Sequence, residues 1–296
     1  MGKIYEALSR AEGESKLGEG KLCESPLMAA KDGAPREEPP QGRFNFVRYS
    51  LGAPSVREND RARRDAASQA ISRRPAAQPA REVTVNPARI DPHLVSFYNF
   101  DRAASEQYNR LALTLISRAA ERGVRRVLVA SAQHGEGRTS VTLNLACALA
   151  RAKQRVLVVD CDLLQPSVTS KLGIDCDLGM AEAFLRGMPP AAAVLRVLPY
   201  GFNVLPSAGR VENSVEILAA PGFWKMLQTF DSDHDFILFD SSPLLAMGDS
   251  SLLVRFTDTT LLVVRQGHTS SSQMAKAIAP FSRDDILGVV INRAQS

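Results

Sequence analysis

The sequence predicts an α/β fold with a mainly parallel sheet covered by helices on both faces. Residues 127–150, VLVASAQHGEGRTSVTLNLACALA, read as a strand, a glycine-rich turn and a helix. Two further apolar runs, RVLVVD at 155–160 and DFILFD at 235–240, each end in aspartate. Continuous apolar runs, unlike alternating ones, are typical of strands buried on both faces of a parallel sheet.

Helix and strand patterns alternate between residues 103 and 292. A helix is predicted at 103–121, before the glycine-rich segment. The elements predicted after that segment are a strand at 155–160, a helix at 178–186, a strand at 201–206, a helical stretch at 213–230 interrupted at Pro221, a strand at 235–240, a helix at 247–255, a strand at 259–265, a helix at 271–280 and a strand at 286–292. Such alternation predicts a P-loop NTPase-like architecture once the glycine-rich turn is included.

The glycine-rich turn is a candidate phosphate-binding loop. Backbone N–H groups of such a turn and of the following helix point at a single anion, and glycine permits the backbone conformations this requires. The generic pattern G-x-x-x-x-G-K-[ST] is broken at Ala132 and at Arg138. An ordinary strand-to-helix turn is the alternative interpretation. The candidate nucleotide-binding residues here are Gly135, Glu136, Gly137, Arg138, Thr139 and Ser140.

Acidic residues follow two of the predicted strands. Carboxylates just beyond parallel strands emerge at the edge of the sheet where ligands of open α/β folds bind. Beside a phosphate-binding loop, they are placed to hold Mg²⁺ together with the loop hydroxyl. The alternative is that these aspartates merely end strands and cap helices. The candidate metal ligands are Thr139, Asp160, Asp162 and Asp240.

Composition excludes some classes of protein. The net charge of +4 and the pI of about 9.0 are too mild to indicate a nucleic-acid partner. The four cysteines show no metal-binding spacing and suit reduced thiols. No apolar run reaches the ~18 residues of a membrane span, and the amino terminus has no secretory apolar region. We therefore expect a cytoplasmic protein without a transmembrane segment.

The amino-terminal part differs in composition from the rest. Residues 1–13 can form a short amphipathic helix, and residues 14–87 are rich in Pro, Ala, Arg, Gly and Ser. Such a composition predicts a disordered linker, although its arginines could also contact anionic lipid. We expect the folded P-loop domain to span residues 88–296.

Several motifs together resemble the bacterial tyrosine kinases of capsule and exopolysaccharide production. GEGRTS resembles the Walker A motif of this family, VLVVDCDLLQP its second nucleotide motif, and FILFDSSPLLAMGDS its Walker B motif with a later Asp249. ILGVVIN resembles the strand that ends in an adenine-recognising asparagine, here Asn292. The segments DPHLVSFYNFDRAASEQYNRLALTLI and MGKIYEALSRAE resemble the entry segment and the start of stand-alone members.

The resemblance implies a set of ligands and partners. It implies ATP or ADP with Mg²⁺ as cofactors and catalytic roles for Arg138, Asp160 and Asp162. It also implies a membrane-embedded polysaccharide co-polymerase, or chain-length regulator, as the partner. Such a partner would hold the protein at the inner face of the membrane, with residues 1–13 as the docking element.

The chain departs from this family at several functional positions. Arg138 replaces the Walker A lysine, Leu164 an arginine of the second motif, and Ser242 a proline of Walker B. Asn109 and Ala112 replace two arginines that follow Glu106 in the family's oligomerisation helix, where we expect Arg110 to pair with Glu106 instead. No tyrosine follows Tyr200, so the tyrosine cluster of the family is absent from this sequence.

These substitutions favour a kinase-like ATP-binding regulator with weak or no tyrosine kinase activity and at most weak self-association. Three alternatives stay open. The first is an active autokinase that phosphorylates Tyr5, Tyr49 or Tyr98. The second is a partitioning-type positioning ATPase, although the second lysine of that class is missing between Ser131 and Gly137. The third is a structural protein that binds no nucleotide.

Overall fold

The computed structural model describes residues 80–98, 101–246, 249–279, 281–282 and 285–292. The amphipathic helix expected at residues 1–13, and nearly all of the linker expected at 14–87, lie outside these ranges.

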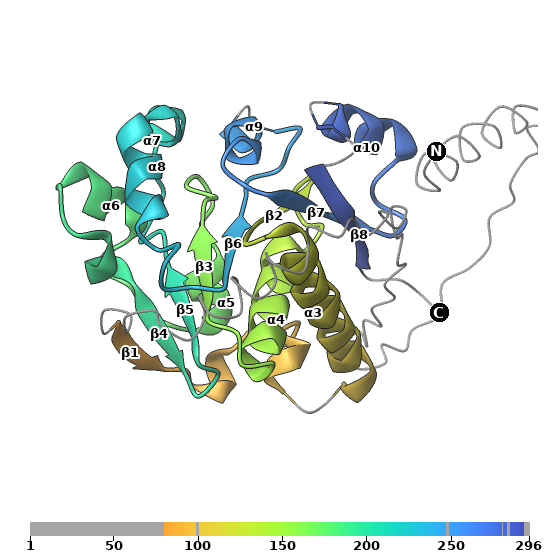
Figure 1. Ribbon diagram of the computed structural model, residues 1–296, viewed down its shortest axis with the longest axis horizontal. Helices are drawn as coiled ribbons and strands as arrows, with labels where there is room; N and C mark the ends of the chain where they lie inside the picture. Colours follow the sequence, from red (N-terminus) through yellow and green to blue (C-terminus); the bar gives the residue numbers. More distant parts are fainter. Residues whose placement is uncertain (1–79, 99–100, 247–248, 280, 283–284, 293–296) are drawn as a thin grey trace, which may run out of the picture.

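The described strands form one eight-stranded sheet, in the order β1-β4-β5-β3-β6-β2-β7-β8 (Figure 1). All neighbouring strands are parallel except β4 and β5. The strands are β1 (Arg81–Thr84), β2 (Arg126–Ser131), β3 (Val156–Asp160), β4 (Leu195–Leu198), β5 (Phe202–Leu205), β6 (Phe236–Asp240), β7 (Thr259–Arg265) and β8 (Ile286–Asn292). The predicted mainly parallel sheet is confirmed.

Helices cover both faces of the sheet. They are α3 (Arg102–Arg122), α4 (Arg138–Arg151), α5 (Val168–Leu172), α6 (Met180–Leu185), α7 (Ser214–Ala219), α8 (Pro221–Gln228), α9 (Asp249–Val254) and α10 (Ser271–Ile278), with short 3-10 turns η1 (Pro87–Arg89), η2 (Val95–Phe97) and η3 (Pro190–Ala193). One hydrophobic core packs α3, α4, α5 and η2 against the sheet. A second core packs α6, α7, α8, α9 and α10 against it.

Strand β2 shows how the sheet serves two cores. Val127 and Val129 contribute to the core beneath α3 and α4, whereas Leu128 and Ala130 contribute to the opposite core. All four side chains are fully buried. Because side chains alternate across a strand, a continuous apolar run satisfies both faces at once.

Local signals set several helix boundaries. The side chain of Asp101 accepts a hydrogen bond from the N–H of Ala104 at 2.8 Å and so caps the start of α3. Gly123, with φ of 71°, ends the same helix in the left-handed conformation. The predicted interruption at Pro221 is also confirmed, because α7 ends before Ala220 and α8 begins at Pro221.

The folded part of the chain begins earlier than predicted. Strand β1 starts at Arg81 and pairs in parallel with β4, so the expected domain start at residue 88 is wrong. Val85, which follows β1, is buried in the core beneath α4. The segment REVT is too short and too polar to predict a strand by itself; β4 gives it a partner.

Three adjacent strands position the candidate site. Strand β6 lies between β3 and β2, and Asp160 of β3 is in register with Asp240 of β6. Because these strands are parallel, their carboxyl ends lie at one edge of the sheet, next to the turn that follows β2.

Candidate functional site

The glycine-rich turn joins β2 to the buried helix α4. Gly135 and Gly137 have φ of 77° and 92°, in the left-handed region that favours glycine. A Cβ at Gly137 would lie 2.0 Å from Nδ2 of Asn292, the last residue of β8. Glycine at position 137 is therefore required both by the backbone conformation and by the close approach of Asn292.

Glu136 connects this turn to the loop after β7 and to the end of β8. Its carboxylate is buried and accepts hydrogen bonds from the N–H of Gln133 at 2.9 Å and from the hydroxyl of Thr269. Nδ2 of Asn292 donates to the backbone carbonyl of Glu136 at 2.8 Å. Thr269 had no signal in the sequence that pointed to the site, because it precedes α10 in a short polar loop.

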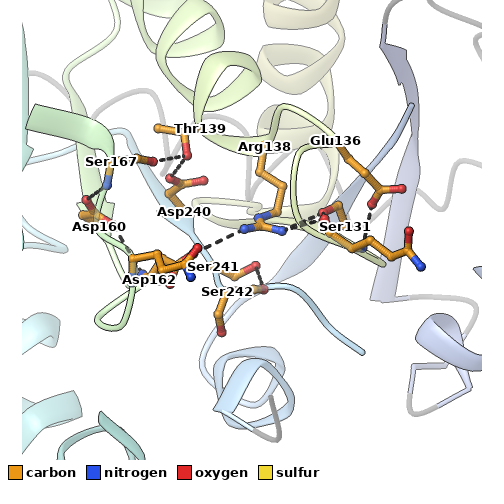
Figure 2. A network of polar contacts seen from close by, with 12 residues as sticks. Ser131, Glu136, Arg138, Thr139, Asp160, Asp162, Ser167, Asp240, Ser241 and Ser242 are labelled. Atoms are coloured by element: carbon orange, nitrogen blue, oxygen red, sulfur yellow. Dashed lines mark hydrogen bonds and ion pairs between the residues drawn. The ribbon is translucent and has the colours of Figure 1, made fainter. Parts of the chain in front are cut away.

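Arg138, the first residue of α4, points across the site and is held by its neighbours. Figure 2 shows its guanidinium group between Asp162 and Ser131. Nη1 donates to Oγ of Ser131 at 2.7 Å and to the carbonyl of Gln133 at 3.2 Å, and Nη2 pairs with Asp162 at 3.3 Å. The side chains of Arg138 and Asp162 are only 8% and 6% exposed, so this ion pair is buried.

Thr139 connects the turn to β6. Its hydroxyl donates to Oδ2 of Asp240 at 2.6 Å and lies 2.8 Å from Oγ of Ser167 (Figure 2). The hydroxyl of Thr142, one turn along α4, donates to the other oxygen of Asp240 at 3.3 Å. Ser140 is buried beside them, and its carbonyl accepts a hydrogen bond from Asn144.

Asp160 and Asp162 have different partners. Asp160 accepts hydrogen bonds from the backbone N–H groups of Asp162, Ser167 and Val168, so it holds the loop between β3 and α5. Asp162 accepts from the N–H of Gln165 and is the counter-ion of Arg138. The sequence placed both aspartates at the site but did not distinguish these roles.

Burial raises the pKa of Asp160 and Asp240, the two aspartates in register. Burial raises the pKa of Asp240 to about 6, although the charge of Arg138 and the hydroxyl of Thr139 act in the opposite direction. The pKa of Asp160 is raised well above its usual value by burial and by the neighbouring Asp240. Both buried carboxyls are therefore harder to ionise than an exposed aspartate.

The described side chains at this site do not by themselves make up a complete metal site. Within the described part of the chain, no group of three or more His, Cys, Asp or Glu residues could hold a metal ion. Among the candidate ligands, Thr139 and Asp240 lie in contact, whereas Asp162 is paired with Arg138. Bound Mg²⁺ would thus need oxygen atoms from a phosphate and from water as well.

The structure also places positions at which the chain departs from the motifs of the tyrosine kinase family. Leu164 is half-buried, and Ser242 is buried. Nε of Arg110 lies 3.8 Å from Oε1 of Glu106 on the exposed face of α3, so the predicted pair within the helix is confirmed. Ala112 is 1% exposed and belongs to the core. The side chain of Asp249, at the start of α9, lies outside the description.

None of the helices placed by the structure is both long enough and apolar enough to cross a membrane.

A glycine-rich turn at the start of a buried helix, next to two aspartates at the carboxyl edge of a mainly parallel sheet, defines a protein of the P-loop NTPase type. Residues 124–280, more than half of the chain, match the AAA domain family. The chain belongs to this family.

Comparison with individual proteins confirms the similarity to bacterial tyrosine kinases. The tyrosine-protein kinase YwqD of Bacillus subtilis is 27% identical over 69% of this chain and 87% of its own. The kinase domain of the Escherichia coli tyrosine kinase ETK superposes with a TM-score of 0.64 at 22% identity, over 71% of this chain and 85% of that domain. This second likeness concerns the fold.

Other similarities cover less. The chromosome-partitioning ATPase Soj of Thermus thermophilus is 36% identical over 42% of this chain and 48% of its own. Several curated relatives named as tyrosine kinases are longer proteins, of which this chain spans between 21% and 29%.

Proposed function

We propose that this chain is a kinase-like protein that binds ADP or ATP with Mg²⁺ and regulates exopolysaccharide synthesis and export. We further propose that its tyrosine kinase activity is weak or absent. The observation that supports both statements is the buried, anchored Arg138 at the position of the Walker A lysine.

Arg138 supports nucleotide binding through a donor that the protein leaves unused. Its Nε–H is buried and has no hydrogen-bond partner among the residues that the structure describes. A buried donor without a partner costs about 1–3 kcal/mol, which a bound phosphate oxygen would recover. The cationic fork of arginine suits phosphate oxygens, and the N–H groups at the start of α4 are directed to the same region.

The same residue argues against efficient phosphoryl transfer. A Walker A lysine carries a compact charge on a flexible stem, whereas Arg138 is fixed to Ser131, Gln133 and Asp162. A group so anchored can hold a phosphate in the ground state but follows a transferring phosphoryl group poorly. Losing one contact made in the transition state typically costs ~10²–10³ in rate.

Thr139 and Asp240 are the residues that would hold Mg²⁺. Asp160 lies in register with Asp240 on the adjacent strand. Bound Mg²⁺ would neutralise phosphate charge. Thr139 would supply a hydroxyl oxygen, and Asp240 would accept the hydrogen of that hydroxyl, as it does in the structure.

Nucleotide binding is tested by thermal unfolding with ADP or ATP and Mg²⁺. A ligand at 100 times its Kd stabilises the native state by about 2.7 kcal/mol, so the unfolding midpoint should rise. Thr139→Ala and Asp160→Ala should reduce this rise. Thr114→Ala, on α3 away from the site, is the matched control. Unchanged midpoints at millimolar nucleotide would favour the structural alternative.

Kinase activity is tested with the purified full chain, ATP and Mg²⁺. We expect little phosphotyrosine. The hydroxyls of Tyr98 and Tyr200 donate to backbone carbonyls, and Tyr108 is fully buried, so these three are poor acceptors as they stand. Strong phosphotyrosine on the wild-type protein, lost in Arg138→Ala, would instead establish the active autokinase.

The proposed partner is a membrane-embedded polysaccharide co-polymerase. The support is the similarity to tyrosine kinases and the motifs of their stand-alone members. Cell fractionation should find the chain at the membrane only when the co-polymerase is present, and deletion of residues 1–13 should release it. Retention at the membrane without the partner would contradict the proposal.

Self-association should be weak. Glu106 is paired with Arg110 of its own helix, and Ala112 is buried rather than available to a neighbouring subunit. Light scattering of the isolated protein should give a monomer or a small oligomer. A stable ring would show that α3 assembles by other contacts.

A further inference from the structure

Ser167, in the loop between β3 and α5, lies against the candidate magnesium ligand. Its Oγ is 2.8 Å from Oγ1 of Thr139, and Figure 2 shows the contact beside Asp240. No motif of the sequence singled out this serine. It is half-buried, so it borders the site without being sealed from a ligand.

The direction of this hydrogen bond follows from the inventory of hydrogens. Thr139 has one hydroxyl hydrogen, and it is donated to Asp240 at 2.6 Å. Ser167 must therefore donate to Thr139. The oxygen of Thr139 then gives one hydrogen, accepts one, and keeps one lone pair for a further partner.

The side chain of Ser167 does not make the hydrogen bond expected at its place in the chain. It is the residue that precedes α5, where serine normally caps the helix with its own side chain. Here the side chain makes no cap hydrogen bond. The carboxylate of Asp160 instead accepts the N–H groups of Ser167 and Val168, at 3.2 and 3.1 Å. Asp160 thus frees the serine hydroxyl to turn toward Thr139.

We propose that Ser167 is a positioning residue of the magnesium site, whose hydroxyl orients Thr139 so that one lone pair faces the metal ion. This inference rests on the proposed function, because it requires Mg²⁺ to bind with nucleotide. Partners that orient a metal ligand typically change metal affinity about 10–100-fold when removed.

The test measures ADP affinity of the full chain by calorimetry, once with MgCl₂ and once with EDTA. Ser167→Ala should lower the gain in affinity from Mg²⁺ by about tenfold and leave the affinity in EDTA unchanged. Ser167→Thr, which keeps the hydroxyl, should restore the gain. Ser170→Ala is the matched control, because Ser170 lies on α5 and donates only to the carbonyl of Ser167.

The possible results separate failure of this inference from failure of the proposed function. An unchanged gain from Mg²⁺ in Ser167→Ala overturns the inference, as does an equal loss of affinity in EDTA, which would mean a structural role. If wild-type protein binds ADP equally well with and without Mg²⁺, the inference fails while nucleotide binding stands. If it binds no ADP in either buffer, the proposed function itself fails.

Discussion

Asp160 and Asp240 occupy registered positions on the adjacent parallel strands β3 and β6, and both side chains are completely buried. Burial raises the pKa of both, that of Asp240 to about 6; the charge of Asp240 adds to the shift of Asp160, and the charge of Asp162 adds to the shift of Asp240. The protein thus keeps two carboxyl groups in its core whose ionised forms are destabilised by burial. A bound cation would relieve this cost.

Asp240→Asn should stabilise the free protein at neutral pH. A carboxyl whose folded pKa is raised contributes stability below its unfolded pKa of about 3.8 and loses it as the pH rises through about 6. The asparagine carries no such dependence. The difference in unfolding midpoint between variant and wild type should therefore grow from pH 4 to pH 7.5. A difference that is constant with pH would contradict the assignment.

Gly137→Ala should damage the turn, whereas Gly135→Ala should be milder. Both positions have positive φ, which costs about 1–3 kcal/mol for a residue with a Cβ. The new Cβ would also meet Asn292 at Gly137, whereas at Gly135 no atom of the described residues lies within 4 Å of it. Denaturant unfolding should show the larger loss for Gly137→Ala. Adding Asn292→Ala should recover the part due to contact.

Breaking the buried pair of Arg138 and Asp162 from one side should cost more than removing both charges. Arg138→Met removes the buried counter-ion of Asp162, and breaking a buried ion pair from one side typically costs about 3–5 kcal/mol. The double variant Arg138→Met with Asp162→Asn removes that charge. Urea unfolding should give the double variant a smaller loss than Arg138→Met alone, and a loss below the sum of the two single losses by about 1–3 kcal/mol. Simple additivity would mean that the two charges do not interact.

Stability should fall in mild acid through His234. Burial lowers the pKa of this histidine, and its ring bonds the carbonyl of Phe230 and the amide of Asn203. The contribution is present above the unfolded pKa of about 6.5 and is lost as the pH falls through the folded value. His234→Gln should flatten the loss between pH 7 and 5. The exposed His268→Gln should leave it unchanged.

The sequence alone predicted the central strands and the residues gathered at their carboxyl ends, because long apolar runs and the GEGRTS turn carry strong local signals. Strands β1 and β4 were missed, since four-residue segments such as REVT depend on a partner strand for their structure. Ser167 and Thr269 reach the site through loops, and sequence spacing does not encode loop contacts. The predicted roles of Asp162 and Asn292 toward a nucleotide stay predictions.

Helix α5 is joined to the segment that follows β1 by a side-chain pair and a backbone hydrogen bond. Lys171 of α5 pairs with Asp91 at 2.7 Å, and the carbonyl of Lys171 accepts the N–H of Asp91. Because Asp91 follows β1 closely in the chain, these contacts hold α5 to the edge of the sheet at which β1 lies. Ser167 directly precedes α5, so a displacement of α5 would also move the hydroxyl that contacts Thr139.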